Sequence, residues 1–303
     1  MQFIRRSALL FILFLLLTGQ AFACLNESLV KRLKNDFPLY INDIEDIVPG
    51  HRLFNVLHYN NGVQQLKRLY AVNKDPDVLS DIGLLLILER RYDQAIDLYR
   101  NMEQQYPGRY ATASNIGTAF ELTGQNDSAL KWISRAVAIN PKSHDSSEWL
   151  HVNILKAKLK EPSVINSNFL LGIDFGKDSM PRATRLEDPD TLGRIYEALY
   201  YQLNERITFI KGKDPIVARL LFDMANIFLY ENETWEASVL YQRAKEYGYN
   251  SPLLEARMDY CSKRPDKDAD LQQQNISNFE IVLLSILTGI VLIPIVLLLR
   301  MKH

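Results

Sequence analysis

The chain has 303 residues, of which 47% are hydrophobic and 23% are charged. Both fractions are typical of globular proteins, which excludes a largely disordered chain. Without the four basic residues that flank the two apolar end segments, 31 of the 35 basic residues remain against 36 acidic ones, so the middle of the chain carries a formal charge of −5. We do not expect it to bind nucleic acid, because phosphate contacts need a basic surface.

The first 23 residues have the pattern of a secretory signal peptide. Arg5 and Arg6 precede an apolar stretch over residues 7–18, and Ala21-Phe22-Ala23 forms a cleavage pattern of the A-x-A type. The stretch is short for a membrane-spanning helix, which needs about 20 apolar residues. We therefore expect residues 1–23 to be removed, which leaves Cys24 at the new N-terminus.

The two cysteines of the chain are Cys24 and Cys261. A disulfide between them would suit an oxidising compartment, but it requires Cα atoms within about 6 Å of each other. Lipidation of Cys24 is a second interpretation, because bacterial lipoproteins carry a cysteine directly after the signal peptide, although Ala21 stands where a leucine is usual. Two buried or idle thiols are the third interpretation. The sequence leaves these three open.

Residues 24–75 have scattered apolar residues and carry Pro38, Pro49 and Gly50, so we expect an N-terminal segment of two or three short helices that docks on the first repeat of the array. A repeat with an offset of 34 residues then runs over 76–143. Six pairs correspond at this offset: Ile82 and Ile116, Gly83 and Gly117, Leu86 and Phe120, Ala95 and Ala129, Tyr99 and Ile133, Pro107 and Pro141. A fixed period of this length is typical of helical arrays.

The small residues and the closing proline of each unit resemble the tetratricopeptide repeat, although Leu79 and Ala113 stand where that family has an aromatic residue. The resemblance implies an all-α fold, a TPR-like solenoid of helical hairpins. In that family the first helix of each hairpin lines a concave wall that binds peptides or partner domains. The residues implied to face this wall are small or weakly polar and offer no Lys/Arg clamp for a carboxylate: Ser80, Leu84, Ser114 and Thr118.

Residues 144–189 are predicted to form one helix of a degenerate repeat, followed by an irregular insertion with three prolines. His144, Glu148 and His151 have helical spacing and are weak candidates for metal ligands, since zinc sites use three or four such groups. A helix cap at Asp145 or Ser146 would leave His144 outside the helix. We therefore predict no metal and no cofactor.

Residues 190–262 are predicted to be helical, with a third TPR-like unit over 218–249 and a closing helix near its end. Tyr196, Tyr200 and Tyr201 cluster at the start of this region, and Tyr200 is a further candidate for partner binding. The polar stretch over 263–280 reads as a linker.

Residues 281–299 are 19 uncharged, mostly apolar residues. At ~1.5 Å per residue they reach ~28 Å, which favours a single transmembrane helix. The tail over 300–303 carries Arg300 and Lys302, which favours a cytoplasmic location for it. We expect a type I protein of the cytoplasmic membrane whose folded part lies on the outer, periplasmic side.

The sequence holds no phosphate-binding loop, nucleophile elbow or zinc-protease motif. We expect a non-enzymatic, membrane-tethered adaptor that binds a protein partner or helps to assemble an envelope complex. Two alternatives come from other classes. One is a metal-dependent hydrolase that uses the helix over 144–151, and the other is a module for a small ligand or glycan that uses the tyrosine cluster.

Overall fold

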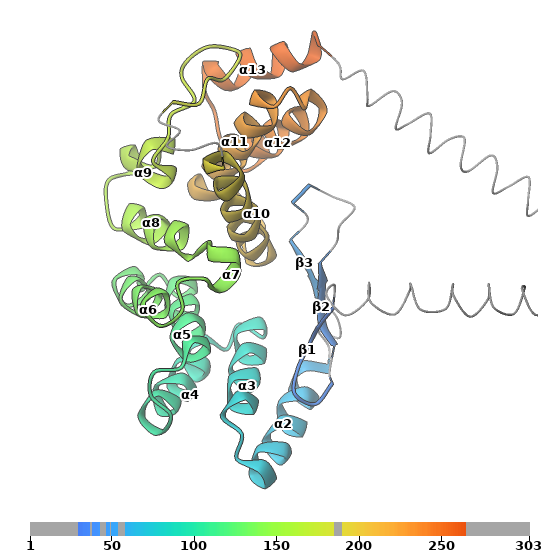
Figure 1. Cartoon of the computed structure of the whole chain (residues 1–303). Coiled ribbons are helices and arrows are strands. Elements are labelled where there is room, and N and C mark those ends of the chain that lie inside the picture. The colour runs from blue at the N-terminus through green and yellow to red at the C-terminus, as the bar shows by residue number, and fades with distance from the viewer. Residues whose placement is uncertain are drawn as a thin grey trace, which may run out of the picture.

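The structure, a computed structural model, describes residues 30–36, 38–42, 47–48, 50–53, 58–184 and 190–264. The helices form a curved row of antiparallel hairpins that runs from α2 (Tyr59–Asn73) at one end to α13 (Pro252–Ser262) at the other (Figure 1). A small sheet and the long helix α10 (Thr191–Phe209) lie on the inner side of this row. The predicted helical solenoid is confirmed for the hairpin region.

The N-terminal segment departs from the prediction for 24–75, because its described residues form strands before helix α2. Strands β1 (Val30–Arg32), β2 (Pro38–Asn42) and β3 (His51–Leu53) make an antiparallel sheet in the order β1-β2-β3. Asp36 reverses the chain between β1 and β2 with a φ of 60°. Leu33 and Leu39 hold the sheet against the helices, because both are buried in the same apolar cluster as residues of α2.

Glycines set the distance between the helices of each predicted repeat. The first hairpin is α3 (Pro76–Leu88) with α4 (Tyr92–Gln105), and the second is α5 (Tyr110–Leu122) with α6 (Asn126–Ile139). A Cβ atom at Gly83 would lie 2.3 Å from the ring of Tyr99, and one at Gly117 would lie 2.6 Å from Ile133. Only a residue without a side chain permits this approach, so the two glycines recur because the same contact recurs.

Three helices begin with the same pair of residues, a capping side chain followed by a proline. The caps accept a hydrogen bond from a backbone N–H of the first turn, and the proline needs no N–H at that position. The pairs are Asp75-Pro76 at α3, Asp214-Pro215 at α11 (Pro215–Tyr230) and Ser251-Pro252 at α13. These signals mark the starts of α3, α11 and α13 in the sequence itself.

After the two hairpins the chain becomes irregular, as expected for a degenerate repeat with an insertion. A short turn, α7 (Ser143–Ser146), leads into α8 (Glu148–Lys158), a 3-10 helix η2 (Pro162–Val164) and α9 (Ser167–Leu171). The loop after α9 is held by Arg257 of α13, which is fully buried. Its guanidinium donates to the carbonyl oxygens of Phe175 at 3.1 Å and Gly176 at 3.0 Å.

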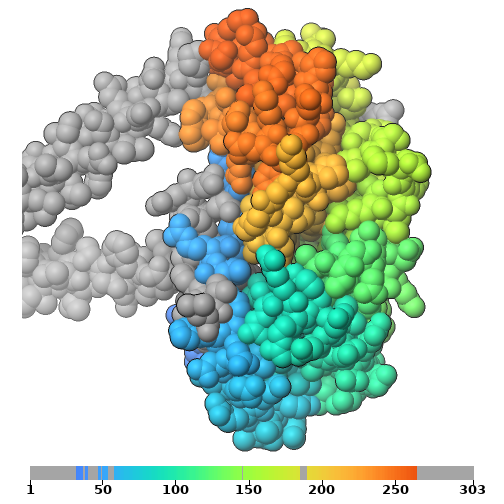
Figure 2. Space-filling view, turned by 180° about the vertical axis from the view of Figure 1, so that it is seen from behind, coloured from blue at the N-terminus to red at the C-terminus, as the bar shows by residue number. Residues whose placement is uncertain are grey.

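The C-terminal hairpin of α11 and α12 (Thr234–Glu246) occupies the range predicted for the third unit. Ala225 and Ala237 are fully buried there, and Tyr241 donates a hydrogen bond to Asn226 at 2.7 Å. Helix α13 packs on α12 and closes this end of the row. In the reverse view the N-terminal part (blue) forms the lower end of the molecule, and the C-terminal helices (orange) form the upper end (Figure 2).

The buried apolar residues form two clusters, one around α2 to α6 and the other around α8 to α13. The turn α7 lies between them. His144 and Ser146 in this turn have φ values of 51° and 60°, a backbone region that residues other than glycine rarely adopt. Local strain of this kind needs support from its surroundings, and His144 receives it from side chains on three helices, as described below.

No helix in the described part of the chain is both long and apolar enough to cross a bilayer. The predicted signal peptide over 1–23, Cys24, the linker beyond residue 264, the spanning segment over 281–299 and the tail over 300–303 lie outside the described residues.

Candidate functional site: the groove on the concave face

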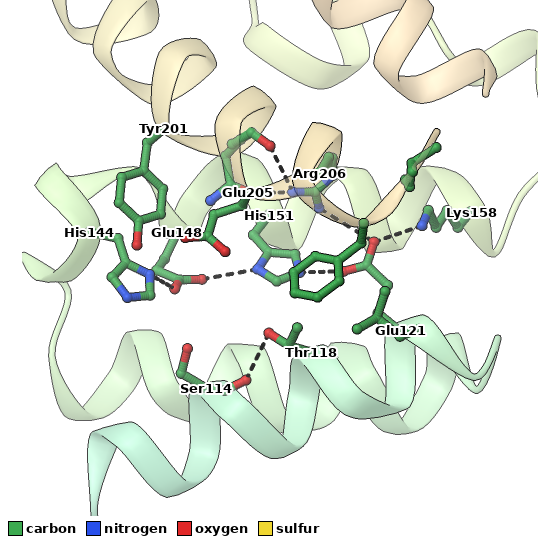
Figure 3. A pocket seen from close by; sticks show the side chains of 14 residues that line it. Ser114, Thr118, Glu121, His144, Glu148, His151, Lys158, Tyr201, Glu205 and Arg206 are labelled. Atoms are coloured by element: carbon green, nitrogen blue, oxygen red, sulfur yellow. Dashed lines mark hydrogen bonds and ion pairs between the residues drawn. The ribbon is translucent and has the colours of Figure 1, made fainter. Parts of the chain in front are cut away.

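The inner side of the row of hairpins is hollowed into a groove made of two adjoining cavities. The outer cavity has a volume of about 400 Å³ and the inner one about 210 Å³. Six residues line both cavities, and we call this shared wall the junction: Ser114, Thr118, His144, Tyr201, Glu205 and Phe209. Figure 3 shows the inner cavity between α5, α8 and α10.

All four residues expected on the concave wall lie in this groove. Ser80, Leu84, Ser114 and Thr118 line the outer cavity, and the last two line the inner cavity as well. Ser80 and Ser114 are 8% and 5% exposed, so they form the floor of the groove. Their contact with a partner stays a prediction.

The opposite wall of the groove belongs to α10, a helix that the sequence did not predict to face the groove. Tyr201, Glu205 and Phe209 of α10 line both cavities. The candidate Tyr200 points elsewhere: it stacks on Tyr196 with ring centroids 6.3 Å apart and packs against the C-terminal core. Of the three clustered tyrosines, Tyr201 is the one that reaches the groove.

The N-terminal sheet borders the mouth of the groove through β3. The backbone N–H of Gly50 donates to Asn204 at 2.9 Å, and that of His51 donates to Thr208 at 2.8 Å. The side chain of His51 also pairs with Glu205, with 3.0 Å between Nε2 and Oε1. Strand β3 is therefore tied along α10 at the mouth of the groove.

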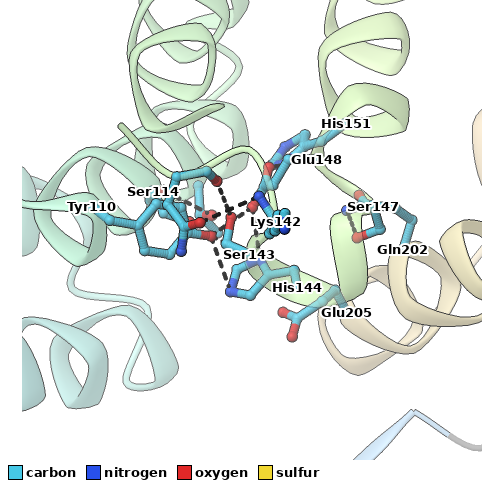
Figure 4. Close-up of polar contacts among 12 residues, drawn as sticks. Tyr110, Ser114, Lys142, Ser143, His144, Ser147, Glu148, His151, Gln202 and Glu205 are labelled. Atoms are coloured by element: carbon cyan, nitrogen blue, oxygen red, sulfur yellow. Dashed lines mark hydrogen bonds and ion pairs between the residues drawn. The ribbon is translucent and has the colours of Figure 1, made fainter. Parts of the chain in front are cut away.

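His144, Glu148 and His151, which the sequence places at helical spacing, come together at the groove (Figure 4). Nδ1 of His144 lies 2.6 Å from Oε1 of Glu148, and Nδ1 of His151 lies 3.3 Å from Oε2. Tyr110 donates to Oε1 of Glu148 at 3.0 Å. The ring of His144 stacks on Tyr201 with 4.6 Å between centroids, which supports the strained turn from the side of α10.

A second carboxylate, Glu121 of α5, completes the cluster at the inner end. It lies 2.6 Å from Nε2 of His151 and 2.7 Å from Nζ of Lys158, and Nη2 of Arg206 is 3.4 Å away. His151 is thus held between two carboxylates, one at each ring nitrogen. Nothing near His151 in the sequence points to Glu121, because 30 residues separate them.

These contacts keep the carboxylates ionised. Burial alone would raise the pKa of Glu121, but the charges of Arg206 and His151 outweigh it and hold that pKa well below 4.5. Burial acts on Glu148 in the same direction, and its contacts with His144 and His151 likewise hold its pKa far below 4.5. Burial would lower the pKa of His151, but the charge of Glu121 raises it above 6.5.

This pattern describes an ion-paired cluster more closely than a metal site. A metal ligand must offer a free imidazole nitrogen, whereas both nitrogens of His151 face carboxylates. Within the described residues, no group of three or more histidine, cysteine, aspartate or glutamate side chains is arranged to hold a metal ion. Cys261 is buried at the end of α13, and its relation to Cys24 lies outside the described residues.

Comparison with known proteins identifies the repeats. The tetratricopeptide repeat family matches residues 86–158. No curated protein matches the chain.

Similar solved structures include a thermophilic TPR protein of Thermus thermophilus, with 14% identity and a TM-score of 0.35 over 69% of this chain and 92% of that chain. A tetratricopeptide repeat protein of Parabacteroides merdae has 12% identity and a TM-score of 0.32, over 67% and 92%. MamA of Desulfovibrio magneticus has 12% identity and a TM-score of 0.33, over 63% and 94%. These values are too low to carry a functional argument, so the family match and the packing at Gly83 and Gly117 identify the repeats.

Proposed function

Since the chain is a tetratricopeptide-repeat protein, we propose that its concave groove binds a segment of a partner protein and that the chain acts as a non-enzymatic adaptor. The observation that carries this proposal is the groove itself. It is lined by first-helix residues of both clear repeats and by the facing helix α10. Stacked helical hairpins use such concave walls to bind extended or helical segments.

The size and lining of the groove suit a polypeptide segment. Its two adjoining cavities have volumes of about 400 and 210 Å³. Together they fall within the volume range of about 300–1,000 Å³ that is typical of ligand pockets. The floor of small residues Ser80, Ser114 and Thr118 lets a ligand backbone approach the helices closely. The walls supply both apolar surface, from Leu84 and Phe209, and charged groups.

We further propose that the protein is held at the outer face of the cytoplasmic membrane. The support is in the sequence: a signal-peptide pattern over 1–23 and an apolar segment over 281–299 followed by basic residues. The polar stretch over 263–280 would then separate the folded part from the bilayer. An adaptor so placed recruits its partner to the membrane surface.

Filling the groove tests the proposal. The variant Thr118→Trp places a large side chain in both cavities, and Leu84→Trp fills the outer one. Val72→Trp is the matched control, because Val72 of α2 is 86% exposed and lines neither cavity. Proteins crosslinked to each variant in intact cells are quantified by mass spectrometry, after circular dichroism confirms that each variant is folded.

The proposal predicts that a specific set of partners is lost from both groove variants and kept by the control. Partners that remain in equal amounts on all three variants would place binding outside the groove and overturn the proposal.

A further inference from the structure

We propose that the junction of the two cavities receives a basic side chain, lysine or arginine, from the bound segment. This inference rests on the proposed function and gives the partner segment its chemistry. Its basis is the distribution of charge along the groove. At the inner end the carboxylate is ion-paired with two permanent cations, whereas Glu205, the carboxylate of the junction, is ion-paired with a histidine.

The inner end is balanced at Glu121. Lys158 and Arg206 both lie against this carboxylate, at 2.7 and 3.4 Å, and both are cations at any physiological pH. Arg206 is only 7% exposed and also donates to Gln202 at 2.6 Å. These two cations are therefore engaged with groups of the protein itself.

Glu205 at the junction and Glu148, which lines the inner cavity, have a different environment. In the described part of the chain, the ion pairs of Glu148 are with His144 and His151, and that of Glu205 is with His51. These partners are imidazoles, whose charge is shared or conditional, and His151 is already shared with Glu121. Glu205 therefore has a partly exposed carboxylate whose ion-pair partner is a single imidazole, and a bound cation would give it a permanent counter-charge.

The two carboxylates have separate roles in this arrangement. The side chain of Glu205 is 34% exposed, so it can accept hydrogen bonds from a ligand directly. The side chain of Glu148 is 2% exposed, and its Oε2 atom accepts no hydrogen bond from the described residues. This oxygen lies beneath the surface of the groove, where the low dielectric strengthens the attraction between its negative charge and a cation.

The surroundings of Glu205 match the shape of a long basic side chain. Tyr201 and Phe209 line the junction, and Leu122 and Ile210 line the inner cavity next to it. Lysine and arginine carry an apolar stem with a charge at its tip, so the stem can pack on these residues while the tip reaches Glu205. An acidic side chain in the same place would meet the carboxylate of Glu205.

Peptides that differ only in charge test the inference. Three short biotinylated peptides share one sequence and a photoreactive residue, and their central residue is arginine, citrulline or glutamate. Citrulline has nearly the shape of arginine and no charge. Binding to the full-length protein in mild detergent is measured by titration and photo-crosslinking, with the crosslinked residues read by mass spectrometry.

The inference predicts that the arginine peptide binds about tenfold or more tightly than the citrulline peptide, since charge-assisted hydrogen bonds are roughly twice as strong as neutral ones. The glutamate peptide should bind most weakly. In Glu205→Gln the ratio of the affinities for the arginine and citrulline peptides should fall towards one, because the affinity for the arginine peptide falls while that for the citrulline peptide stays unchanged. Glu255→Gln is the control, because Glu255 pairs with Lys245 on the exposed surface of α13.

Other outcomes separate this inference from the proposed function. If the arginine and citrulline peptides bind equally and Thr118→Trp abolishes this binding, the inference of a basic side chain at the junction is overturned. The groove would still be a peptide-binding site. A preference for arginine that survives in Glu205→Gln would overturn the junction as its location. If no peptide binds, the inference fails, and the in-cell crosslinking of the groove variants still decides the adaptor function by itself.

Discussion

His51 of β3 and Glu205 of α10 are paired at 3.0 Å across the mouth of the groove, although 154 residues separate them in the chain. The same strand is tied to α10 by the backbone N–H groups of Gly50 and His51. The N-terminal sheet therefore gives the groove a second border and links the first half of the helical row to the second.

The hydroxyl of Thr208 is the part of this connection that can be removed with least change in shape. Thr208→Val deletes the acceptor of the His51 N–H, at 2.8 Å, and should cost about 1–2 kcal/mol of stability. We expect faster hydrogen exchange at the His51 amide. Thr123→Val is the control, since the contacts of its hydroxyl are all local: it donates to carbonyls of the preceding helix α5 and accepts from Gln125. Unchanged exchange at His51 in Thr208→Val would show that β3 is held by other contacts.

Gly83 can be tested against a glycine in open space. An added methyl group in Gly83→Ala meets the ring of Tyr99 at 2.3 Å, and such overpacking costs about 1–3 kcal/mol. Gly193 of α10 has no atom within 4 Å of the same position, so Gly193→Ala should instead stabilise by about 0.5–1 kcal/mol. Urea unfolding of the two variants should give changes of opposite sign. Equal changes would mean that Gly83 does not set the spacing of α3 and α4.

The repeats were predictable because their packing leaves a local signature. Gly83 and Gly117 recur at a fixed offset, and each marks the closest contact of its hairpin. The concave residues follow from the same period, so Ser80 and Ser114 were placed correctly at the groove once the family resemblance was recognised.

The rest of the site could not be predicted, because it depends on contacts between distant segments. Tyr201, Glu205 and Phe209 follow each other at intervals of four residues and so share one face of α10, but nothing in the sequence says which face meets the groove. Glu121 of α5 meets His151 of α8 only because folding brings these two helices together. The strands were missed because three to five residues each are too few to show an alternating pattern.

The ionic cluster predicts how stability depends on pH. Glu121 and Glu148 have pKa values lowered by folding, so their contribution is present above pH 4.5 and is lost as the pH falls through their folded values. His151 has a raised pKa, so its contribution is complete below pH 6.5 and is lost as the pH rises through the folded value. We expect greatest stability between these limits in urea unfolding.

His151→Gln isolates the histidine contribution, because glutamine cannot become a cation. In this variant the loss of stability above pH 6.5 should flatten, and the variant should be least stable relative to the parent protein below that pH. A parent and variant whose stabilities differ by the same amount at pH 5 and pH 9 would contradict the assignment of a charged His151.

Arg257 predicts a local effect in the insertion. Its guanidinium is fully buried and donates to the carbonyls of Phe175 and Gly176. Hydrogen bonds from charged donors contribute about 1.5–3 kcal/mol, so Arg257→Met should lose more than about 2 kcal/mol. Limited proteolysis should then cut within residues 172–184. Arg182→Met, at an 81% exposed side chain, should leave both stability and cleavage unchanged.

The central claim, that the groove contacts a partner protein, is tested most directly by photo-crosslinking from single positions in living cells. A photoreactive residue replaces Leu84 in the outer cavity or, as the matched control, Asp97, whose side chain is 74% exposed on the outer helix α4 of the same hairpin (Figure 1). The account predicts a discrete crosslinked partner from position 84 that is lost when Thr118→Trp is added. The same partner captured equally from both positions, or only from position 97, would contradict it.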